Sequence, residues 1–325
     1  MLLKLFVFLI VSTTVLTLGQ VQNDPETICP PADLLSPYCK CSKGCDLCPA
    51  TVECSDVLNF GDLEAVFRNT PDWTFWHFSI VRSSFPYIPA NAIVEKRVRN
   101  LYLRNNTMYT MFDEPPASTN LLQELELTDL RLLRGVSWDV YSTLEHLKEI
   151  NLTNFKILKI DQEFVHHFPQ GLTGLYFRET RTKRLGDDAF ANLANLTRLF
   201  IRDTQISELK RSMFPPVSKL IAMHFSGNQI SSLPDDLFTN MPDLRGVDFS
   251  NTNVVTLPES VFGRIMPQLG VLYLEGNAVN CNCEMKWIPK LKVLPYYARV
   301  ECTRPKELEG FTLKKLKEAH FVHCE

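Results

Sequence analysis

Residues 272–287 read LYLEGNAVNCNCEMKW, and this stretch holds both the pattern that builds the fold and the place where the pattern stops. Leu272 and Leu274 alternate along the chain, and Asn277 and Val279 follow them at fixed spacing. Two cysteines separated by a single residue come directly afterwards. An apolar pattern that ends in paired thiols indicates that the cysteines provide the stabilisation that a further copy of the pattern would otherwise provide.

The same pattern recurs through the middle of the chain with a nearly constant period. The last apolar residue of each L-x-x-L-x-L core follows the preceding one after 23 to 25 residues, and a second apolar residue stands two positions before it. That period is typical of leucine-rich repeats, in which each unit forms one short strand and returns through a turn and a convex segment. We therefore predict an α/β leucine-rich-repeat solenoid, a horseshoe with a concave parallel sheet, made of nine repeats over residues 59–280. The core positions are Ile80, Leu103, Leu127, Leu152, Phe177, Ile201, Phe225, Phe249 and Leu274.

A phenylalanine marker supports the same register independently. Four successive repeats carry a phenylalanine thirteen residues after the core position. Equivalent residues of stacked turns lie next to one another, so these rings are predicted to pack in a row. They are Phe190, Phe214, Phe238 and Phe262.

The position three residues after each core residue predicts where the turns are regular. Asn106, Asn228 and Asn277 occupy it in three repeats, and an asparagine there can satisfy backbone groups of adjoining turns. Leu130 and Phe155 occupy it in repeats three and four and cannot do so. We therefore predict locally irregular turns in these two repeats, hidden under the convex loops.

The ten cysteines lie only at the two ends of the repeat array. Terminal repeats expose apolar core and unpaired strand edges, which must be covered. Six cysteines between positions 29 and 54 and four between 281 and 324 can each pair completely, so residues 20–58 and 281–325 are predicted to be disulfide-bonded caps. In the second cap we expect Trp287 to cover the core and the amphipathic segment 304–321 to form a helix.

The second cap resembles that of extracellular leucine-rich-repeat proteins, which carries C-x-C-x3-W and two later cysteines. Residues 281–287 match this motif, whereas spacing alone leaves three pairings of the four cysteines open. The first cluster resembles the C…C-x-C…C frame of the same class. The resemblance implies the pairs Cys281–Cys302, Cys283–Cys324, Cys29–Cys41 and Cys39–Cys54. Cys45 and Cys48 depart from the simplest cap of this class, and we expect a local extra bridge between them. The competing interpretation of the first cluster is a zinc site of Cys39, Cys41, Cys45 and Cys48.

A narrower resemblance rests on CPPADLLSPYCKC (29–41), CSDVLNFGDLEAVF (54–67), LPDDLFTNMPDL (233–244) and CNCEMKWI (281–288). These segments resemble a group of secreted arthropod leucine-rich-repeat proteins that are similar to the large non-catalytic subunit of Oplophorus (shrimp) luciferase. Most of the shared residues belong to repeats and caps, so the resemblance implies the fold. It also implies an alternative function, in which the chain is a non-catalytic accessory subunit that stabilises a small secreted oxidase, its catalytic subunit.

The N-terminal residues predict export from the cell. Residues 1–19 combine Lys4, an apolar core and small residues before Gln20, which is the pattern of a cleaved signal peptide. We expect a secreted, extracellular protein without a membrane span, since no later apolar run reaches the roughly 20 residues that a span needs. The formal net charge of -3 supplies no basic footprint for nucleic acid.

Residues that point outwards from the predicted strands indicate where a partner binds. Repeats five and six place arginines beside aromatic rings, which are the usual residues of binding hot spots. We predict that this Arg/aromatic zone binds an extracellular protein or an acidic ligand; it consists of Tyr176, Arg178, Arg198, Phe200, Arg202 and His224. Repeats three and four present an acidic zone of Glu124, Glu126 and Glu149. The alternative is a solvated sheet face of mixed composition that binds nothing.

Three glycosylation sequons constrain that surface. They start at Asn105, Asn151 and Asn195. Asn151 belongs to the same outward column as Tyr176 and Phe200, so a glycan there would shield repeat four. A partner that covers the whole concave face is therefore not expected.

No motif in the chain predicts catalysis. The sequence lacks the nucleophile elbow, the zinc-protease helix, the dinucleotide fingerprint and the phosphate loop. The doublet His166-His167 falls on the convex side without a third ligand, and no cofactor or metal site is predicted. The functional prediction is a non-enzymatic binding or scaffold protein; the alternatives are the accessory subunit described above and a purely structural matrix role.

Overall fold

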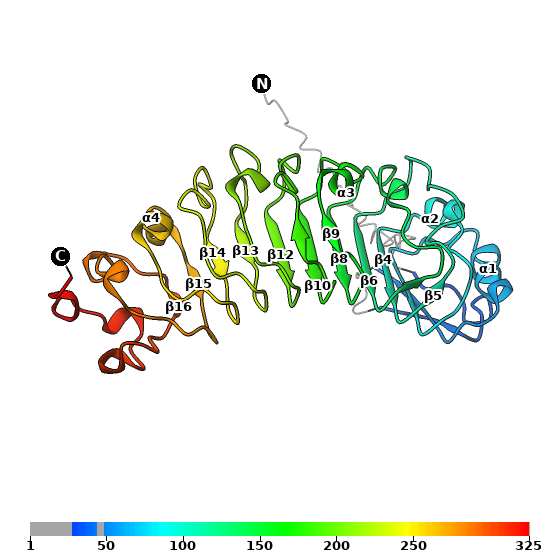
Figure 1. Cartoon of the computed structure of the whole chain (residues 1–325). Coiled ribbons are helices and arrows are strands. Elements are labelled where there is room, and N and C mark those ends of the chain that lie inside the picture. Colours follow the sequence, from blue (N-terminus) through cyan, green and yellow to red (C-terminus); the bar gives the residue numbers. More distant parts are fainter. Residues whose placement is uncertain (1–27, 44–48, 325) are drawn as a thin grey trace, which may run out of the picture.

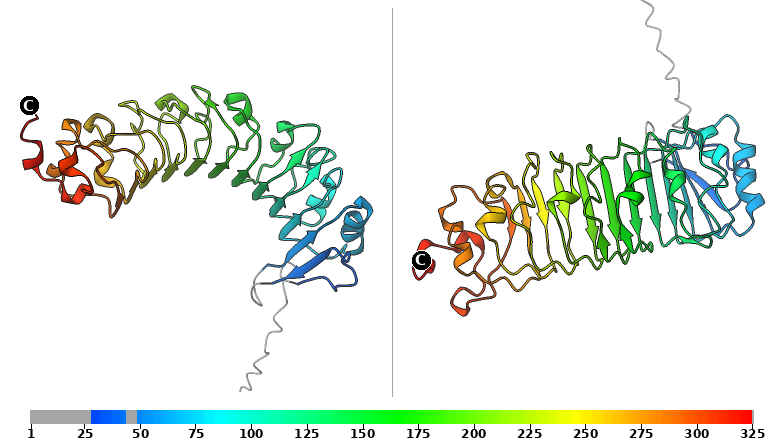
Figure 2. Two further views of the ribbon diagram at one scale, coloured as in Figure 1. Left: turned by 60° about the horizontal axis from the view of Figure 1, so that its bottom comes forward. Right: turned by 45° about the horizontal axis from the view of Figure 1, so that its top comes forward.

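In the computed structural model the described residues, 28–43 and 49–324, form a curved solenoid (Figure 1). Within these ranges, a sheet of 12 strands lines the inner side of the curve, and short helices and loops cover its outer side (Figure 2, left). Segments with disulfide bonds close both ends of the sheet. No helix in the described part of the chain combines the length and the apolar character needed to cross a membrane.

Nine parallel strands, one from each predicted repeat, form most of this sheet. In the first six repeats each core residue pairs with the core residue of the next repeat, as Phe177 does with Leu152 on one side and Ile201 on the other. The shorter strands of the last three repeats keep the same register up to the residue before the core position. Successive side chains of a strand point to opposite faces, so this register buries one apolar column and leaves the adjacent column on the concave face. The strands are β3 (His77–Val81), β4 (Asn100–Arg104), β6 (Glu124–Thr128), β8 (Glu149–Thr153), β10 (Gly174–Arg178), β12 (Arg198–Arg202), β13 (Ala222–His224), β14 (Gly246–Asp248) and β15 (Val271–Tyr273).

The sheet continues beyond the repeats into both caps. At one end β2 (Thr51–Ser55) pairs parallel with β3, and β1 (Cys39–Ser42) folds back antiparallel on β2. At the other end β16 (Tyr297–Arg299) pairs parallel with β15, so the second cap contributes a strand that the repeat pattern did not predict. Its sequence signal is the alternation of Ala298 and Val300, which occupy the inward positions of one more repeat.

Segment 304–321 does not form the predicted cap helix. It contains three short 3₁₀ turns, η7 (Lys306–Leu308), η8 (Leu313–Lys315) and η9 (Glu318–Phe321). Gly310 has a φ of 78°, a left-handed conformation that a continuous helix cannot contain. Its N–H donates to the Cys302 carbonyl at 2.9 Å, and the Phe311 carbonyl accepts from the Cys302 N–H at the same distance. The backbone in the middle of this segment is therefore paired with the strand region and is not free to continue a helix.

The outer side carries short helices and two small sheets. α1 begins where the Asn59 side chain accepts a hydrogen bond from the Gly61 N–H at 3.0 Å. In the described residues the α-helices are α1 (Phe60–Asn69), α2 (Ala90–Glu95), α3 (Gln162–His166) and α4 (Glu259–Phe262). The short strands pair as β5 (Thr107–Met108) with β7 (Arg131–Leu132), and β9 (Lys159–Ile160) with β11 (Arg184–Leu185). The other 3₁₀ turns are η2 (Trp138–Tyr141), η3 (Arg211–Met213), η4 (Met266–Gln268), η5 (Cys283–Met285) and η6 (Ile288–Lys290).

The predicted phenylalanine residues pack between neighbouring repeats in the core. Phe190 lies against Phe214 with ring centroids 6.1 Å apart, and Phe238 lies against Phe262 at 5.7 Å. All four side chains are at most 5% exposed. Burying a phenylalanine side chain stabilises a fold by roughly 1.5–3 kcal/mol, so these two pairs stabilise the contact between neighbouring repeats on the convex side.

The turns that follow the strands are regular through repeats three and four. Asp129 and Asn154 have φ values of 52° and 50°, the left-handed conformation found two residues after the core position in the other repeats. Their N–H groups donate to carbonyls of the next repeat at 3.1 and 2.9 Å. The prediction of irregular turns is therefore wrong. Leu130 and Phe155 bury their side chains, while the left-handed residue before each of them makes the turn.

Four disulfide bonds close the caps in the described residues. They join Cys29 to Cys41, Cys39 to Cys54, Cys281 to Cys302 and Cys283 to Cys324, which are the pairs that the resemblance implied. Because Cys39 and Cys41 are both bonded to other cysteines, the alternative zinc site is contradicted. The expected bridge between Cys45 and Cys48 lies outside the described residues, as does the expected signal peptide.

Trp287 covers the end of the repeat array. Its side chain is 5% exposed, and its Nε1–H donates to the Leu257 carbonyl of the eighth repeat at 2.9 Å. A buried indole with a satisfied N–H adds a large apolar area without leaving a polar group unpaired. The tryptophan stands thirteen residues after Leu274 and thus occupies the phenylalanine position of the ninth repeat.

Candidate functional site on the concave face

The concave face carries a row of three aromatic rings, here called the aromatic row. Tyr176 on β10, Phe200 on β12 and His224 on β13 are paired residues of adjacent strands. The rings of Tyr176 and Phe200 meet edge to face with centroids 5.1 Å apart, and those of Phe200 and His224 stack at 4.0 Å. These cross-strand contacts form one continuous ridge over three repeats of a rigid sheet.

A glycine makes room for the first ring of the row. A Cβ on Gly174 would lie 2.7 Å from the Tyr176 ring, so the ring lies over the glycine. Next to it, Arg198 and Glu149 form an ion pair that reaches from β12 to β8 across β10. Burial raises the pKa of Tyr176, and the Glu149 carboxylate raises it further. The phenol is therefore neutral at physiological pH.

Two of the three arginines in the predicted Arg/aromatic zone are already paired. Arg198 is paired with the glutamate of β8, and Arg178 lies 3.3 Å from Glu179 and 3.4 Å from Asp203. The half-buried Arg202 forms no ion pair with any carboxylate of the described residues. The uncompensated positive charge beside the aromatic row therefore rests on Arg202.

His224 extends the aromatic row as a neutral ring. Burial lowers its pKa below the usual histidine value; Asp248 opposes this shift, and Arg202 adds to it. The Nδ1 atom of His224 lies 3.7 Å from Oδ2 of Asp248. A neutral imidazole stacks on Phe200 without bringing a charge into the contact.

The predicted acidic zone is largely neutralised by its own neighbours. Glu124 accepts hydrogen bonds from Asn100 and from the Tyr102 hydroxyl, the latter at 3.2 Å. Glu126 accepts from Nε of Arg104 at 2.9 Å, and the third glutamate belongs to the ion pair that crosses β10. One ion pair, between Arg198 and Glu149, thus connects the two zones, and they do not act as two opposite poles.

No protein-family model matches the chain, and no curated protein matches it. Among solved structures the chain is similar to a chain of the octameric complex of latrophilin 3, Unc5D and FLRT2, whose FLRT2 component is the leucine-rich-repeat part, with 21% identity and a TM-score of 0.57. That match covers 80% of this chain and 85% of the other. The fold is a leucine-rich-repeat solenoid. A TLR13–ssRNA13 complex matches with 20% identity and a TM-score of 0.43, over 69% of this chain and 28% of the other.

One of the three sequons lies on the concave face of the leucine-rich-repeat solenoid, next to the aromatic row. Asn151 on β8 is paired in register with Tyr176, and its side-chain oxygen accepts a hydrogen bond from Thr153 at 3.3 Å. Asn105 is exposed in a left-handed turn, and Asn195 is exposed between strands. A glycan on Asn151 would therefore border the aromatic row on its N-terminal side.

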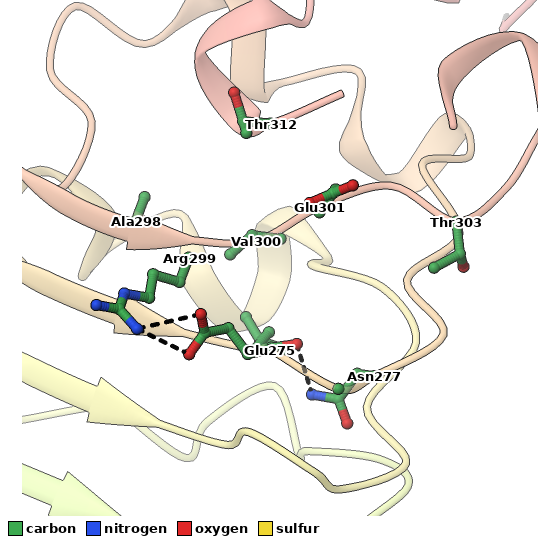
Figure 3. Close-up of a pocket in the computed structure, with 10 residues that line it drawn as sticks. Glu275, Asn277, Ala298, Arg299, Val300, Glu301, Thr303 and Thr312 are labelled. Carbon is green, nitrogen blue, oxygen red and sulfur yellow. Dashed lines mark hydrogen bonds and ion pairs between the residues drawn. The ribbon is translucent and has the colours of Figure 1, made fainter. Parts of the chain in front are cut away.

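Sequence reasoning missed a pocket between the last repeat of the solenoid and the second cap (Figure 3). Its volume is about 510 Å³, and it lies where β16 continues the sheet. Arg299 of β16 lies 3.2 Å from Glu275 and also lies over the Tyr273 ring, 5.1 Å from its centroid. Because Arg299 and Glu275 are already paired with each other, the aromatic row is the stronger candidate site.

The histidine doublet does not join the concave site. His166 ends α3 on the outer side, and Nδ1 of His167 lies 3.3 Å from Asp139. In the described residues one trio of side chains lies close enough together to hold a metal ion, namely Cys283, His323 and Cys324. The two cysteines are bonded to each other, and a disulfide sulfur is not a thiolate ligand.

Proposed function

We propose that the protein is a secreted, non-enzymatic binding protein that recognises a protein partner on the concave face, with the aromatic row as its anchor. The observation that carries this proposal is the continuous contact of Tyr176, Phe200 and His224 beside Arg202, which lacks a carboxylate partner in the described residues. Aromatic and arginine side chains are the commonest hot-spot types, and rings on a rigid sheet lose little freedom on binding. Four disulfide bonds in the described residues support an oxidising, extracellular location.

The charges around the row define the chemistry of the partner. A polyacid would have to displace the carboxylates that already hold Arg178 and Arg198. Arg202 can bind one carboxylate without breaking an existing ion pair. The partner is therefore a protein segment that places an apolar or aromatic side chain on the row and one acidic side chain on Arg202, and a strongly acidic ligand is disfavoured.

Glycosylation sets one limit of this site. Because Asn151 is paired in register with Tyr176, a glycan on it confines the partner to the repeats on the C-terminal side of β8. Mass measurement of the tryptic glycopeptide before and after enzymatic deglycosylation tests whether the sequon is occupied. The sequons at Asn105 and Asn195 do not border the row, so their glycans would leave binding unchanged.

A small catalytic chain is the alternative partner. The observation in its favour is the resemblance of the caps and repeats to a luciferase-associated subunit. Purification from native secretion separates the two functions: an equimolar small chain with oxidase activity supports the accessory role, whereas a partner without catalytic activity supports the binding role. Association with insoluble material and no saturable binding would support a structural matrix role instead.

The decisive experiment replaces Phe200 and Arg202 together with alanine. Immobilised wild-type protein captures partners from native secretion, mass spectrometry identifies them, and the purified partner is then titrated against each variant. Loss of two hot-spot side chains is expected to weaken binding by at least about thirtyfold. Tyr273→Ala removes a ring from the same column outside the row and serves as the matched control, with affinity within about twofold of wild type. Unchanged affinity of the Phe200→Ala/Arg202→Ala variant, with an intact circular dichroism spectrum, would refute the proposal.

A further inference from the structure

We propose a second binding site, for a small neutral apolar molecule that carries one hydrogen-bond acceptor oxygen. The site is a pocket of about 300 Å³ between the convex segments that follow β5 and β7. This volume is at the lower end of the range for small-molecule pockets. The site lies away from the concave strands and is independent of the function proposed above.

The floor of the pocket is apolar and deeply buried. Met111 and Phe112 come from the convex segment after β5, and Tyr141 comes from η2 in the next repeat; they are 4%, 3% and 1% exposed. Leu132 and Val136 are half-buried and line the sides. A concave apolar floor with few polar groups is the usual construction of a site for a small apolar ligand.

The Tyr141 hydroxyl defines the polar contact of the ligand. In the described residues its one hydrogen-bond partner is Sδ of Met111, at 3.9 Å. A thioether is a weak acceptor, and a buried hydroxyl with no better partner requires an explanation. Met111 and Tyr141 both line the pocket, and the proposal places this hydroxyl where a ligand oxygen can accept its hydrogen. Burial also raises the pKa of Tyr141, so the phenol stays protonated and acts as a donor.

The rim of the pocket selects against anions. Asp113, Glu114 and Asp139 are exposed side chains that line it. Asp113 accepts the Ala90 N–H at 2.8 Å, and Asp139 lies 3.3 Å from His167, so these two carboxylates already have partners. Their negative charges repel a carboxylate or sulfonate at the entrance. The tyrosine hydroxyl is then the polar group that remains for a neutral ligand, such as a ketone, ester or ether.

Three probes of similar size test this chemistry on the full-length protein. Acetophenone has an apolar ring and a carbonyl oxygen, α-methylstyrene replaces that oxygen with CH₂, and benzoate adds a negative charge. Dissociation constants are measured by ligand-observed NMR titration. Acetophenone is expected to bind roughly fivefold more tightly than α-methylstyrene, which corresponds to one neutral hydrogen bond, and benzoate is not expected to bind.

Variants assign the binding to this pocket. Tyr141→Phe removes only the hydroxyl, so it is expected to abolish the preference for acetophenone over α-methylstyrene while both still bind. Val140→Phe places a ring into the pocket and is expected to abolish binding of both. Phe200→Ala on the concave face is expected to change neither affinity, which separates this site from the proposed protein-binding site.

Four outcomes would overturn the inference. If acetophenone fails to bind the wild-type protein, the proposed site does not exist. Equal affinities for acetophenone and α-methylstyrene, or a preference that survives in Tyr141→Phe, would show that the hydroxyl is not used. Unchanged binding to Val140→Phe would place the probes elsewhere. Matching unfolding temperatures of wild type and Tyr141→Phe establish that the comparison concerns the same fold.

Discussion

Each turn of the solenoid depends on one residue in the left-handed conformation, two positions after the core residue. Asparagine, aspartate and glycine adopt this conformation more readily than other residues, because their side chains are absent or can hydrogen-bond locally. They fill most of these positions, at Asp56, Asn105, Asp129, Asn154, Asp203, Gly227, Asn251 and Gly276. Arg82 and Glu179 also occupy such turns, with φ values of 47° and 55°.

Gly227→Ala is expected to destabilise the protein by about 1–3 kcal/mol. The residue has a φ of 69°, and an added Cβ would lie 3.1 Å from the backbone N and Cα of Asp203 in the preceding turn. Backbone atoms cannot move aside as a flexible side chain can, so two turns would have to shift. Chemical denaturation measures the loss. Gly270→Ala is the matched control, since a Cβ there would lie 3.7 Å from the Arg245 carbonyl oxygen, which is an ordinary contact; equal losses for both variants would contradict this account.

The same turns show what single residues could and could not predict. The asparagines at the third position led to the expectation that Leu130 and Phe155 disturb the turns. The structure shows that the turn is already determined by Asp129 and Asn154, one residue earlier. Likewise, the residues of the Arg/aromatic zone follow from the strand register, but the ion pairs of its arginines do not. Arg198 pairs with a glutamate 49 residues away, and both side chains lie beside the Tyr176 ring of the strand between them.

At the scale of elements, a buried lysine holds α1 against the first repeats. Lys96 follows α2 and is 1% exposed. Its Nζ donates to the carbonyl of Thr70, the residue that ends α1, and lies 5.6 Å from the centroid of the Phe75 ring. A positive charge at a helix C-terminus stabilises the carbonyls that have no partner within the helix. Burial lowers the pKa of Lys96, so this contact retains its charge at some cost.

Lys96→Met is therefore expected to lower the free energy of unfolding by about 1–3 kcal/mol. Methionine keeps most of the apolar stem, so the loss reports the charged donor of the Thr70 carbonyl, which keeps its second hydrogen bond, from the Trp73 N–H at 3.2 Å. Thermal and urea unfolding measure it. Lys148→Met changes an exposed lysine that also donates to a carbonyl, that of Gly171 at 3.4 Å, and is expected to change stability by less than about 0.5 kcal/mol. If Lys96→Met left the free energy of unfolding unchanged, the Lys96 ammonium would not stabilise the end of α1.

The elements differ in how far sequence determines them. A period that recurs nine times averages out local exceptions, and all nine repeat strands were predicted from it. β16 occurs once, and its inward pair Ala298 and Val300 is too short to form a pattern without a neighbouring strand to complete it. In the segment after it, apolar spacing favoured a helix, but the left-handed Gly310 and its pairing with Cys302 prevent one. Tertiary contacts overrode local propensity in both places.

At the scale of the whole molecule, each repeat contacts only its neighbours, so stability is approximately a sum of repeat and interface terms. The two caps lie at opposite ends of the curve, far apart in space (Figure 2). A defect in one cap should therefore loosen the nearest strands and leave the middle of the sheet protected. The aromatic row on β10 to β13 lies in that middle, so the proposed binding site depends little on either cap.

Removing the Cys283–Cys324 bond by replacing both cysteines with serine tests this local behaviour. The bond joins residues 41 positions apart, and its loss is expected to cost about 2–4 kcal/mol in the cap. Hydrogen exchange followed by mass spectrometry should show faster exchange in β15 and β16 and unchanged exchange in β8. Replacing Cys29 and Cys41 with serine is the matched variant at the other end, where β1 and β2 should loosen instead. If either change raised hydrogen exchange equally in all strands, the array would unfold as one cooperative unit. The stability of the binding site would then depend on both caps.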